Sequence, residues 1–227
     1  PSMPLVVGYP GFWIANPDTG IDAQRVLHRD QCVELFSPIP MHEEIVGRTS
    51  VTSIVDRGKG RGSLLFSSRD IVSARSGALL ARVSQTHILR GDDGFGSVAA
   101  RNPEPTTVPD GEPWAVVDLN TRSEQALLYR LNGDANPLHW SPGVARAAGF
   151  DRPILQGMCT FAVVCHALLS ATGYAPSRIQ SMFMKFCSPA YPGDTLRTEI
   201  WGDGHFRTSA VQRAMVVVGE GRYRSPV

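Results

Sequence analysis

Alternating apolar and polar positions dominate the first half of the chain. Four segments are rich in β-branched and other apolar residues and are separated by turns containing Gly or Pro, at 31–36, 46–55, 63–72 and 79–89. Such segments favour β-strands. The first half is therefore predicted to be an antiparallel meander.

A long apolar helix is the strongest feature of the second half. Residues 158–169 are apolar nearly all round, which is typical of a buried helix. Strands are predicted on both sides of it, at 114–119, 179–186, 195–201 and 211–218. Thr121 or Ser123 is expected to cap a short helix after the first of these strands. The pattern as a whole indicates an α+β fold.

The composition changes between residues 97 and 113. Four prolines and Gly111 fall within this stretch, which is typical of an extended linker. We therefore divide the chain into an N-terminal half, a proline-rich linker and a C-terminal half, at 1–96, 97–113 and 114–227.

Composition and charge argue against several kinds of partner. The 227 residues suffice for one large or two small domains, and a formal net charge of +1 gives no reason to expect nucleic acid. No apolar stretch is long enough to cross a membrane, and no signal peptide or peroxisomal address is seen. The four cysteines lack the spacing of metal ligands, so no metal is expected. We expect reduced thiols and a cytoplasmic protein.

The candidate chemistry lies between the linker and the long helix. Asp134, Asn136 and His139 place an acid, a carboxamide and an imidazole within six residues. Gly133 and Pro137 interrupt the helical composition on either side, so a helix–loop junction is predicted. A carboxylate and an imidazole at this spacing can share one water, which suits proton transfer. An ordinary turn and a satisfied core histidine would fit the same spacing.

Two segments carry a resemblance to a known family. Residues 129–139 read Tyr-Arg-Leu-Asn-Gly-Asp-Ala-Asn-Pro-Leu-His, and residues 149–160 read Gly-Phe-Asp-Arg-Pro-Ile-Leu-Gln-Gly-Met-Cys-Thr. Together they resemble the signature of the (R)-specific enoyl-CoA hydratases, the hydratase 2 or MaoC-like proteins. The similarity continues through 186–201 and reaches back to 26–29 and 89–96, so it covers most of the chain.

The resemblance implies a double hot-dog fold, in which the second half keeps its central helix. The helix of the first half is expected to lie largely before Pro1. Without that helix, the sheet containing strands 46–55 and 79–89 would expose a contiguous apolar patch, which is rare in a monomer. We therefore expect either a longer native chain or a partner subunit that covers this face.

The resemblance also assigns roles to the candidate residues. It implies that Asp134 and His139 are the catalytic pair, that Asn136 supports them, and that the backbone N–H of Gly157 binds the thioester oxygen. The start of a buried helix suits this last role, because its N–H groups are free and its dipole favours negative charge. A plain helix-start glycine would fit equally well on residue type alone. Gln156 departs from the histidine that commonly precedes this glycine in the family.

Substrate contacts are implied at four further positions, His28, Arg29, Arg57 and Phe186. Arg29 and Arg57 replace the glycine and the lysine usual in the family, and arginine can still pair with CoA phosphates. Composition alone would make these charges a solvated surface and Phe186 a strand aromatic.

The implied activity is the reversible hydration of trans-2-enoyl-CoA to (3R)-3-hydroxyacyl-CoA in fatty-acid metabolism. No cofactor is expected beyond the coenzyme A of the substrate, and a homodimer is expected. One alternative is a related hydratase or dehydratase that acts on another acyl thioester, which is linked to acyl carrier protein or bears a branched or steroid side chain. A non-catalytic acyl-CoA-binding subunit is a second alternative, against which the presence of both Asp134 and His139 argues.

Overall fold

The chain divides into two compact units. The computed structural model describes residues 1–91 and 107–226. Residues 3–104 form one unit, and residues 105–227 with residues 1–2 form the other. Each unit is built on an antiparallel sheet, in keeping with the predicted α+β class. Residues 97–106 of the predicted linker lie outside the described residues.

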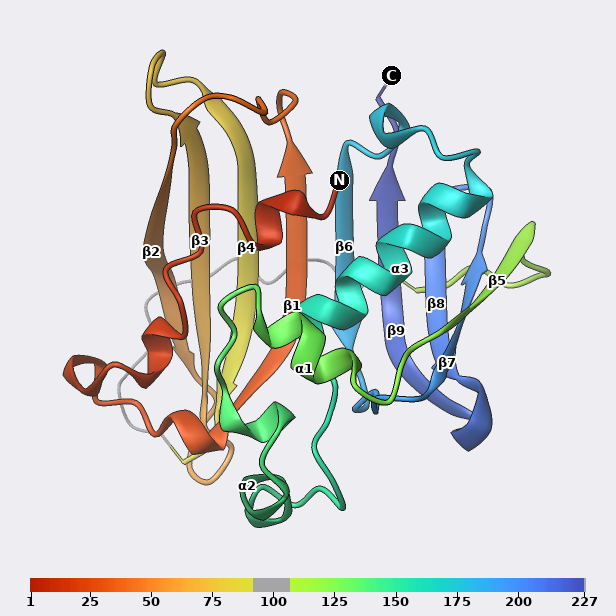
Figure 1. The fold of residues 1–227 in the computed structure, drawn as a ribbon. Coiled ribbons are helices and arrows are strands. Elements are labelled where there is room, and N and C mark those ends of the chain that lie inside the picture. The colour runs from red at the N-terminus through yellow and green to blue at the C-terminus, as the bar shows by residue number, and fades with distance from the viewer. Residues whose placement is uncertain (92–106, 227) are drawn as a thin grey trace. The chain divides into compact units, whose positions relative to one another are not determined.

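Four strands make up the sheet of the first unit. They are β1 (Val26–Leu35), β2 (Ile45–Asp56), β3 (Ser63–Ser73) and β4 (Leu79–Leu89), in the order β2-β3-β4-β1 (Figure 1). The strands predicted at 46–55, 63–72 and 79–89 are confirmed. β1 begins earlier than the predicted residue 31, because Val26 already pairs with Leu89 and a bulge after His28 keeps the ladder going to Asp30.

No α-helix is present in residues 1–91. Residues 3–25 instead contain four 3-10 turns, η1 (Met3–Leu5), η2 (Trp13–Ala15), η3 (Pro17–Thr19) and η4 (Ala23–Arg25). This N-terminal segment, red in Figure 1, runs across one face of the sheet. Ile14, 2% exposed, packs there with Leu65 and Leu89, and Phe12, Trp13 and Ile21 join the same cluster.

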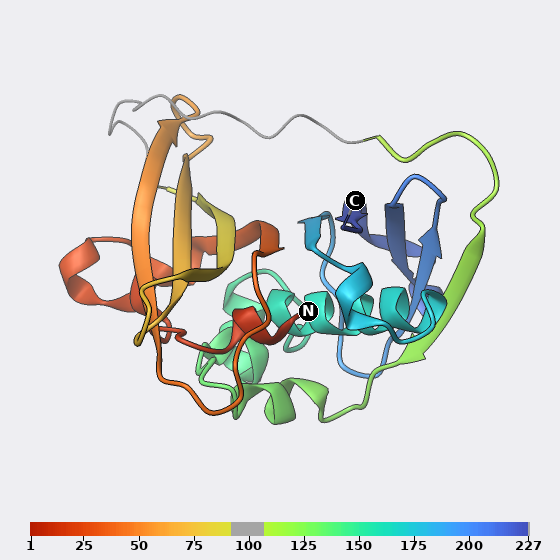
Figure 2. The same cartoon turned by 90° about the horizontal axis from the view of Figure 1, so that it is seen from above.

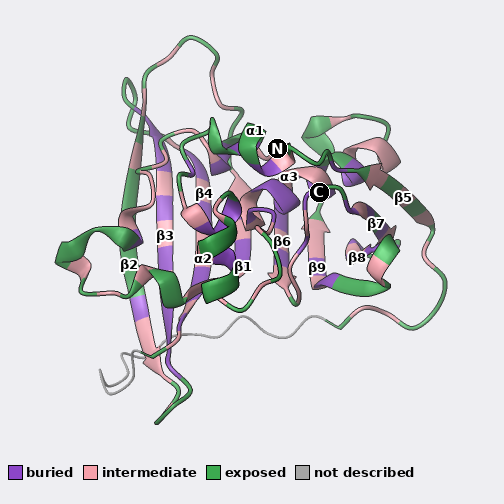
Figure 3. Cartoon of the chain, turned by 60° about the horizontal axis from the view of Figure 1, so that its bottom comes forward, coloured by how far each residue is buried: buried purple, intermediate pink, exposed green. Residues whose placement is uncertain are grey.

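The predicted exposed patch on strands 46–55 and 79–89 is therefore wrong for β4. Leu80, Ala81, Val83 and Leu89 are all buried. The N-terminal segment supplies apolar cover that was expected only from a helix or a partner subunit. Large exposed apolar side chains remain on β2, at Val46 and Val51, and Figure 3 shows the exposed stretch of that strand in green.

A buried arginine fastens the N-terminal segment to the sheet. Arg69 of β3 is 6% exposed, and its Nη2 donates to the carbonyls of Pro4 and Leu5 at 2.7 and 2.9 Å. Its guanidinium also lies 5.3 Å from the centre of the Tyr9 ring. Buried charged donors need such partners, because desolvation without them costs several kcal/mol. Arg69 thus holds the N-terminal segment on the sheet by polar contacts, as the Ile14 cluster does by apolar packing.

Five strands and one long helix form the second unit. The sheet order is β6-β9-β8-β7-β5, made of β5 (Ala115–Asn120), β6 (Ser181–Phe186), β7 (Thr195–Ile200), β8 (His205–Ala210) and β9 (Met215–Arg224). The helix α3 (Gly157–Ala171) lies on one side of this sheet, as Figures 1 and 2 show. It confirms the helix predicted at 158–169.

Apolar packing between α3 and the sheet makes the core of this unit. Alternate residues of β7 and β8 are buried, so one face of these strands is turned to the core, and the residues between them include Arg197, Glu199 and Arg207. Phe161 and Leu168 of α3 and Phe206 of β8 are almost completely buried, and each contributes about 1.5–3 kcal/mol by leaving water. Cys159 lies in the same core, and burial raises the pKa of its thiol to about 12. All four cysteines are free.

Two local predictions for this unit are wrong. The strand expected at 211–218 begins only at Met215, because Val211–Arg213 form the 3-10 turn η7 and Ala214 adopts a left-handed φ of 47°. The β8–β9 hairpin thus turns at a residue that gives no turn signal. Neither Thr121 nor Ser123 caps the helix α1 (Gln125–Arg130), whose N-cap is Glu124. The Thr121 hydroxyl donates instead to the carbonyl of Asp194, at 2.8 Å.

The remaining short helices of this unit lie between α1 and α3 or follow α3 in the chain. They are η5 (Pro137–His139), α2 (Pro142–Ala147) and η6 (Pro176–Arg178). None of the helices in the described residues is long and apolar enough to cross a membrane.

Replacing Arg69 by methionine tests how the N-terminal segment is held. The exchange keeps most of the apolar stem but leaves the carbonyls of Pro4 and Leu5 without their donor. We expect the free energy of unfolding to fall by about 2–3 kcal/mol, measured by urea denaturation. The exposed Arg75 is the matched control, and Arg75→Met should stay within about 0.5 kcal/mol of wild type. Equal stability of the two variants would contradict this account.

Candidate active site

Asp134 lies between α1 and η5, and His139 is the last residue of η5, which confirms the predicted helix–loop junction. Two local hydrogen bonds fix its path. The backbone N–H of Asn136 donates to Asp134 Oδ1 at 3.2 Å, and Asn136 Oδ1 accepts the N–H of Leu138 at 3.0 Å. Pro137 fits the first position of the 3-10 turn, where no N–H is needed. Asn136 thus holds Asp134 through its backbone, while its side chain caps η5.

The imidazole of His139 is buried and oriented by the main chain. It is 9% exposed, and its Nδ1 lies 2.9 Å from the carbonyl oxygen of Ile154. Because a carbonyl can only accept, Nδ1 carries the hydrogen, and in the neutral ring Nε2 then keeps a lone pair. Burial lowers the pKa of His139 below its ordinary value of 6.5, and the charge of Asp134 and the bond to Ile154 oppose this shift. The geometry favours a neutral base at neutral pH.

The segment that orients His139 leads directly into the long helix. The N–H of Leu155 donates to the carbonyl of Ala190 at 2.8 Å. Gln156 is 1% exposed and its Nε2 donates to the carbonyl of Ala126, at 2.9 Å. Gly157 then begins α3, where the first N–H groups have no acceptor within the helix and the dipole favours negative charge. A partly buried N–H donor is therefore connected through this segment to the carbonyl that fixes His139.

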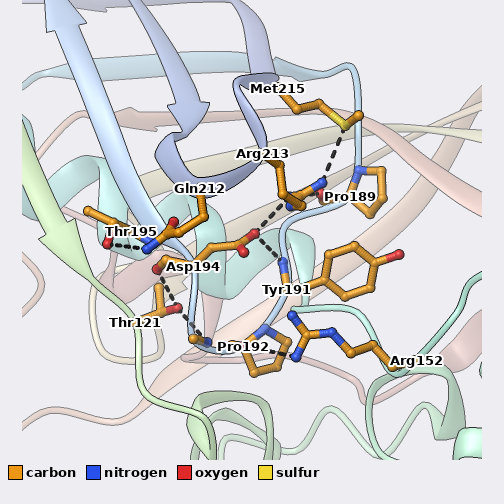
Figure 4. Close-up of polar contacts among 11 residues, drawn as sticks. Thr121, Arg152, Pro189, Tyr191, Pro192, Asp194, Thr195, Gln212, Arg213 and Met215 are labelled. Carbon is orange, nitrogen blue, oxygen red and sulfur yellow. Dashed lines mark hydrogen bonds and ion pairs between the residues drawn. The ribbon is translucent and has the colours of Figure 1, made fainter.

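The loop that contains Ala190, whose carbonyl accepts the N–H of Leu155, is itself fixed by the buried carboxylate of Asp194. Asp194 is 4% exposed; its Oδ2 accepts the N–H of Tyr191 at 2.8 Å and pairs with Arg213 at 2.7 Å. Arg213 also donates to the carbonyl of Pro189, at 2.7 Å. Figure 4 shows these contacts together with the bond from Thr121. The active-site segment thus rests on a loop fixed by an ion pair and by hydrogen bonds.

The predicted substrate contacts are spread over both units. Asp134, Asn136, His139, Gly157 and Phe186 belong to the unit of residues 105–227, and Phe186 ends β6, half-buried. The other three residues, His28, Arg29 and Arg57, belong to the unit of residues 3–104.

These three residues differ in how they are held. The His28 ring stacks on His87 with centroids 5.0 Å apart, and its Nε2 lies 3.0 Å from the carbonyl oxygen of Asp30. Arg29 forms an ion pair with the buried Asp30 at 3.0 Å. Arg57 is exposed in the β2–β3 turn, where its backbone N–H donates to Gly62. Arg29 therefore has a counter-ion in the structure.

Sequence reasoning missed Ile154 and His87. Ile154 acts through its carbonyl, so its side chain carries no signal. His87 is strongly buried, which holds its pKa well below the ordinary range, and only the register of β1 against β4 places it beside His28. In the described part of the chain, no group of three or more His, Cys, Asp or Glu side chains is arranged to hold a metal ion. The turn can transfer a proton to or from a water, and the start of α3 can stabilise a developing anion.

Comparison with known proteins shows which family the chain resembles. The MaoC like domain family matches residues 101–221, and the MFE-2 hydratase 2 N-terminal domain family matches residues 10–91. The chain is 36% identical to 3-hydroxyacyl-thioester dehydratase Y of Mycobacterium tuberculosis, covering 95% of this chain and 78% of the relative. It is 32% identical to peroxisomal enoyl-CoA hydratase 2 of Arabidopsis thaliana, covering 83% of this chain and 63% of the relative.

Solved structures show the same fold. A MaoC-like dehydratase from Phytophthora capsici superposes with a TM-score of 0.83 at 29% identity, covering 90% of this chain and 73% of that one. A Mycobacterium tuberculosis protein described as a double hotdog fold superposes with a TM-score of 0.57 at 19% identity, covering 99% of this chain and 84% of that one. The predicted double hot-dog fold is thereby confirmed.

The protonation of His139 gives a direct test of the geometry. Its imidazole should titrate below 6.5 in NMR spectra, because burial disfavours the charged ring more than Asp134 and Ile154 favour it. Asp134→Asn should lower the pKa of His139 further, since it removes the carboxylate charge that raises it. His42, which is exposed, serves as the control resonance and should not respond. A rise in the His139 pKa on this exchange would show that the two groups do not interact as described.

Proposed function

The chain belongs to the MaoC-like dehydratase and hydratase 2 family, whose members are hydro-lyases, and we propose that it hydrates trans-2-enoyl-CoA reversibly to (3R)-3-hydroxyacyl-CoA. The observation that carries the proposal is the buried His139, whose Nδ1 donates to the carbonyl of Ile154, so that Nε2 is left as the base. Asp134 lies on the same turn, and Gly157 begins the helix that follows Ile154.

Each step of hydration has a group in this site. A water is held between Asp134 and His139. Its oxygen attacks C3 of the enoyl group while Nε2 takes one of its protons. Negative charge then develops on the thioester oxygen, where the N–H of Gly157 stabilises it. The proton that Nε2 took then passes to Asp134, which delivers it to C2, so both groups end in the protonation states in which they began. Asn136 keeps the carboxylate in place through its backbone N–H.

Contacts to the acyl-CoA substrate are proposed for His28, Arg29, Arg57 and Phe186. Arg57 is the better phosphate ligand of the two arginines, because it is exposed while Arg29 is paired with Asp30. Hydration involves no net oxidation or reduction, so the proposal includes no redox cofactor, and the proton transfers assigned to Asp134 and His139 include no metal. The proposal also includes a homodimer, and light scattering of the purified protein measures its molar mass.

A second candidate substrate is an acyl thioester on another carrier. The Mycobacterium relative is named for dehydration of a 3-hydroxyacyl thioester, which is the reverse of the same reaction. Assays with one acyl chain on coenzyme A and on acyl carrier protein separate the two candidates.

Removing either catalytic side chain should abolish most of the turnover. Asp134→Ala and His139→Ala should each lower kcat by about 10²-fold to 10⁴-fold, the usual contribution of a positioned acid or base. The double variant should be little worse, since both groups act on one water. The loss of enoyl absorbance across a chain-length series of enoyl-CoAs measures this, and His42→Ala is the control. Near-wild-type turnover in either single variant would rule out the pair.

Proline at position 157 removes the proposed thioester donor without removing the helix. Proline is tolerated at the first position of a helix, and Gln156 already has the extended φ of −59° and ψ of 140° that a following proline requires. Gly157→Pro should lower kcat by about 10²-fold to 10³-fold. Gly157→Ala adds a side chain but keeps the N–H, so it should retain more activity. If both variants lost activity equally while their thermal midpoints matched wild type, bulk and not the donor would be responsible.

A further inference from the structure

Arg152 is a cation held in place without a counter-ion. Its guanidinium lies 4.8 Å from the centre of the Tyr191 ring, and its Nη1 donates to the carbonyl of Pro192 at 3.3 Å. Arg152 is exposed, and no carboxylate among the described residues forms an ion pair with it, its neighbour Asp151 included. Most of its donors therefore remain available to a ligand.

A second arginine on the same ring shows the contrast. Arg213 lies 4.9 Å from the centre of the Tyr191 ring, but it pairs with the buried Asp194 and donates to the carbonyl of Pro189. Figure 4 shows both arginines beside Tyr191. The charge of Arg213 is neutralised and its donors hold the loop together. Arg152 has no carboxylate partner among the described residues, and its one hydrogen bond to that loop is the bond to Pro192.

The position of Arg152 connects it to the catalytic turn. It lies just before Ile154, whose carbonyl orients His139, and its aromatic partner belongs to the loop that receives the N–H of Leu155. A ligand whose reacting thioester is held at His139 carries its phosphates at the other end of the pantetheine arm. A preorganised guanidinium outside the buried catalytic turn is suited to such a phosphate, because stacking has already restricted its side chain.

We propose that Arg152, stacked on Tyr191, binds a phosphate of the coenzyme A or phosphopantetheine arm of the substrate. This rests on the proposed function, since the ligand is its acyl thioester. Arg152 is a binding residue in this assignment and takes no part in the proton transfer.

Three thioesters of one enoyl chain test the assignment. The chain is carried on coenzyme A, on phosphopantetheine and on pantetheine, which lacks any phosphate. Arg152→Met should raise KM for the coenzyme A thioester by about fivefold to tenfold, with kcat little changed, and should leave the pantetheine thioester unaffected. A parallel rise for the phosphopantetheine thioester assigns the phosphate next to the pantetheine arm. A rise for coenzyme A alone assigns a phosphate of the nucleotide.

Matched variants separate binding from folding. Arg213→Met breaks the ion pair with Asp194, so it should lower the thermal midpoint and affect all three thioesters alike. Arg146→Met removes an exposed cation of α2 and should change none of them. Arg152→Lys should recover part of the loss, because it keeps the charge but not the planar fork.

Two results would overturn the proposal. An equal rise of KM for the pantetheine thioester would show that Arg152 acts through the fold, and unchanged KM values for all three would show that it makes no contact. Binding of coenzyme A itself, followed by calorimetry, is independent of turnover. If the wild-type protein hydrated no thioester, the proposed function would fail, and weaker binding of coenzyme A by Arg152→Met would still decide the phosphate site.

Discussion

The hydrogen bond between His139 Nδ1 and the carbonyl of Ile154 is the contact on which the rest of the site depends. It fixes the ring orientation and, because the carbonyl can only accept, it also fixes which nitrogen is left as the base. A histidine that was free to turn, or that donated through Nε2, would present the wrong atom to the water. One main-chain oxygen therefore decides whether the Asp134 turn can act as an acid–base pair.

The position of that oxygen depends on how firmly the segment of residues 154–156 is held. Residues 154–156 are held on one side by Ala190 and on the other by Ala126, through Leu155 and Gln156. The loop around Ala190 depends in turn on Asp194 and its ion pair. The proposed reacting groups are therefore supported by contacts between residues that take no part in the proposed proton transfer. This is the pattern expected when catalytic geometry must hold within a fraction of an ångström.

Much of this could be predicted from the sequence, and the exceptions have physical causes. The long helix and the strands of the first sheet follow from periodicity, and the Asp134 and His139 pair from its spacing and family resemblance. The role of Ile154 could not be predicted, because a backbone carbonyl is present at every residue. The turn at Ala214 contains no glycine or proline, yet Ala214 adopts a left-handed φ of 47° between the paired residues Ala210 and Met215. Thr121 looks like a helix cap locally, but a residue far along the chain binds its hydroxyl.

The electrostatics of His139 reconcile burial with catalysis. Desolvation is the largest influence and keeps the ring neutral, so it can accept a proton at neutral pH. Asp134 opposes that effect on the pKa, and in the proposed mechanism its charge stabilises the imidazolium that forms once the proton has moved. Without the carboxylate, the buried ring would be too weak a base, and without burial it would be partly protonated before water arrived. The two influences act on one side chain because a short, capped turn carries both residues, which explains why Asn136 and Pro137 matter to the chemistry although neither transfers a proton.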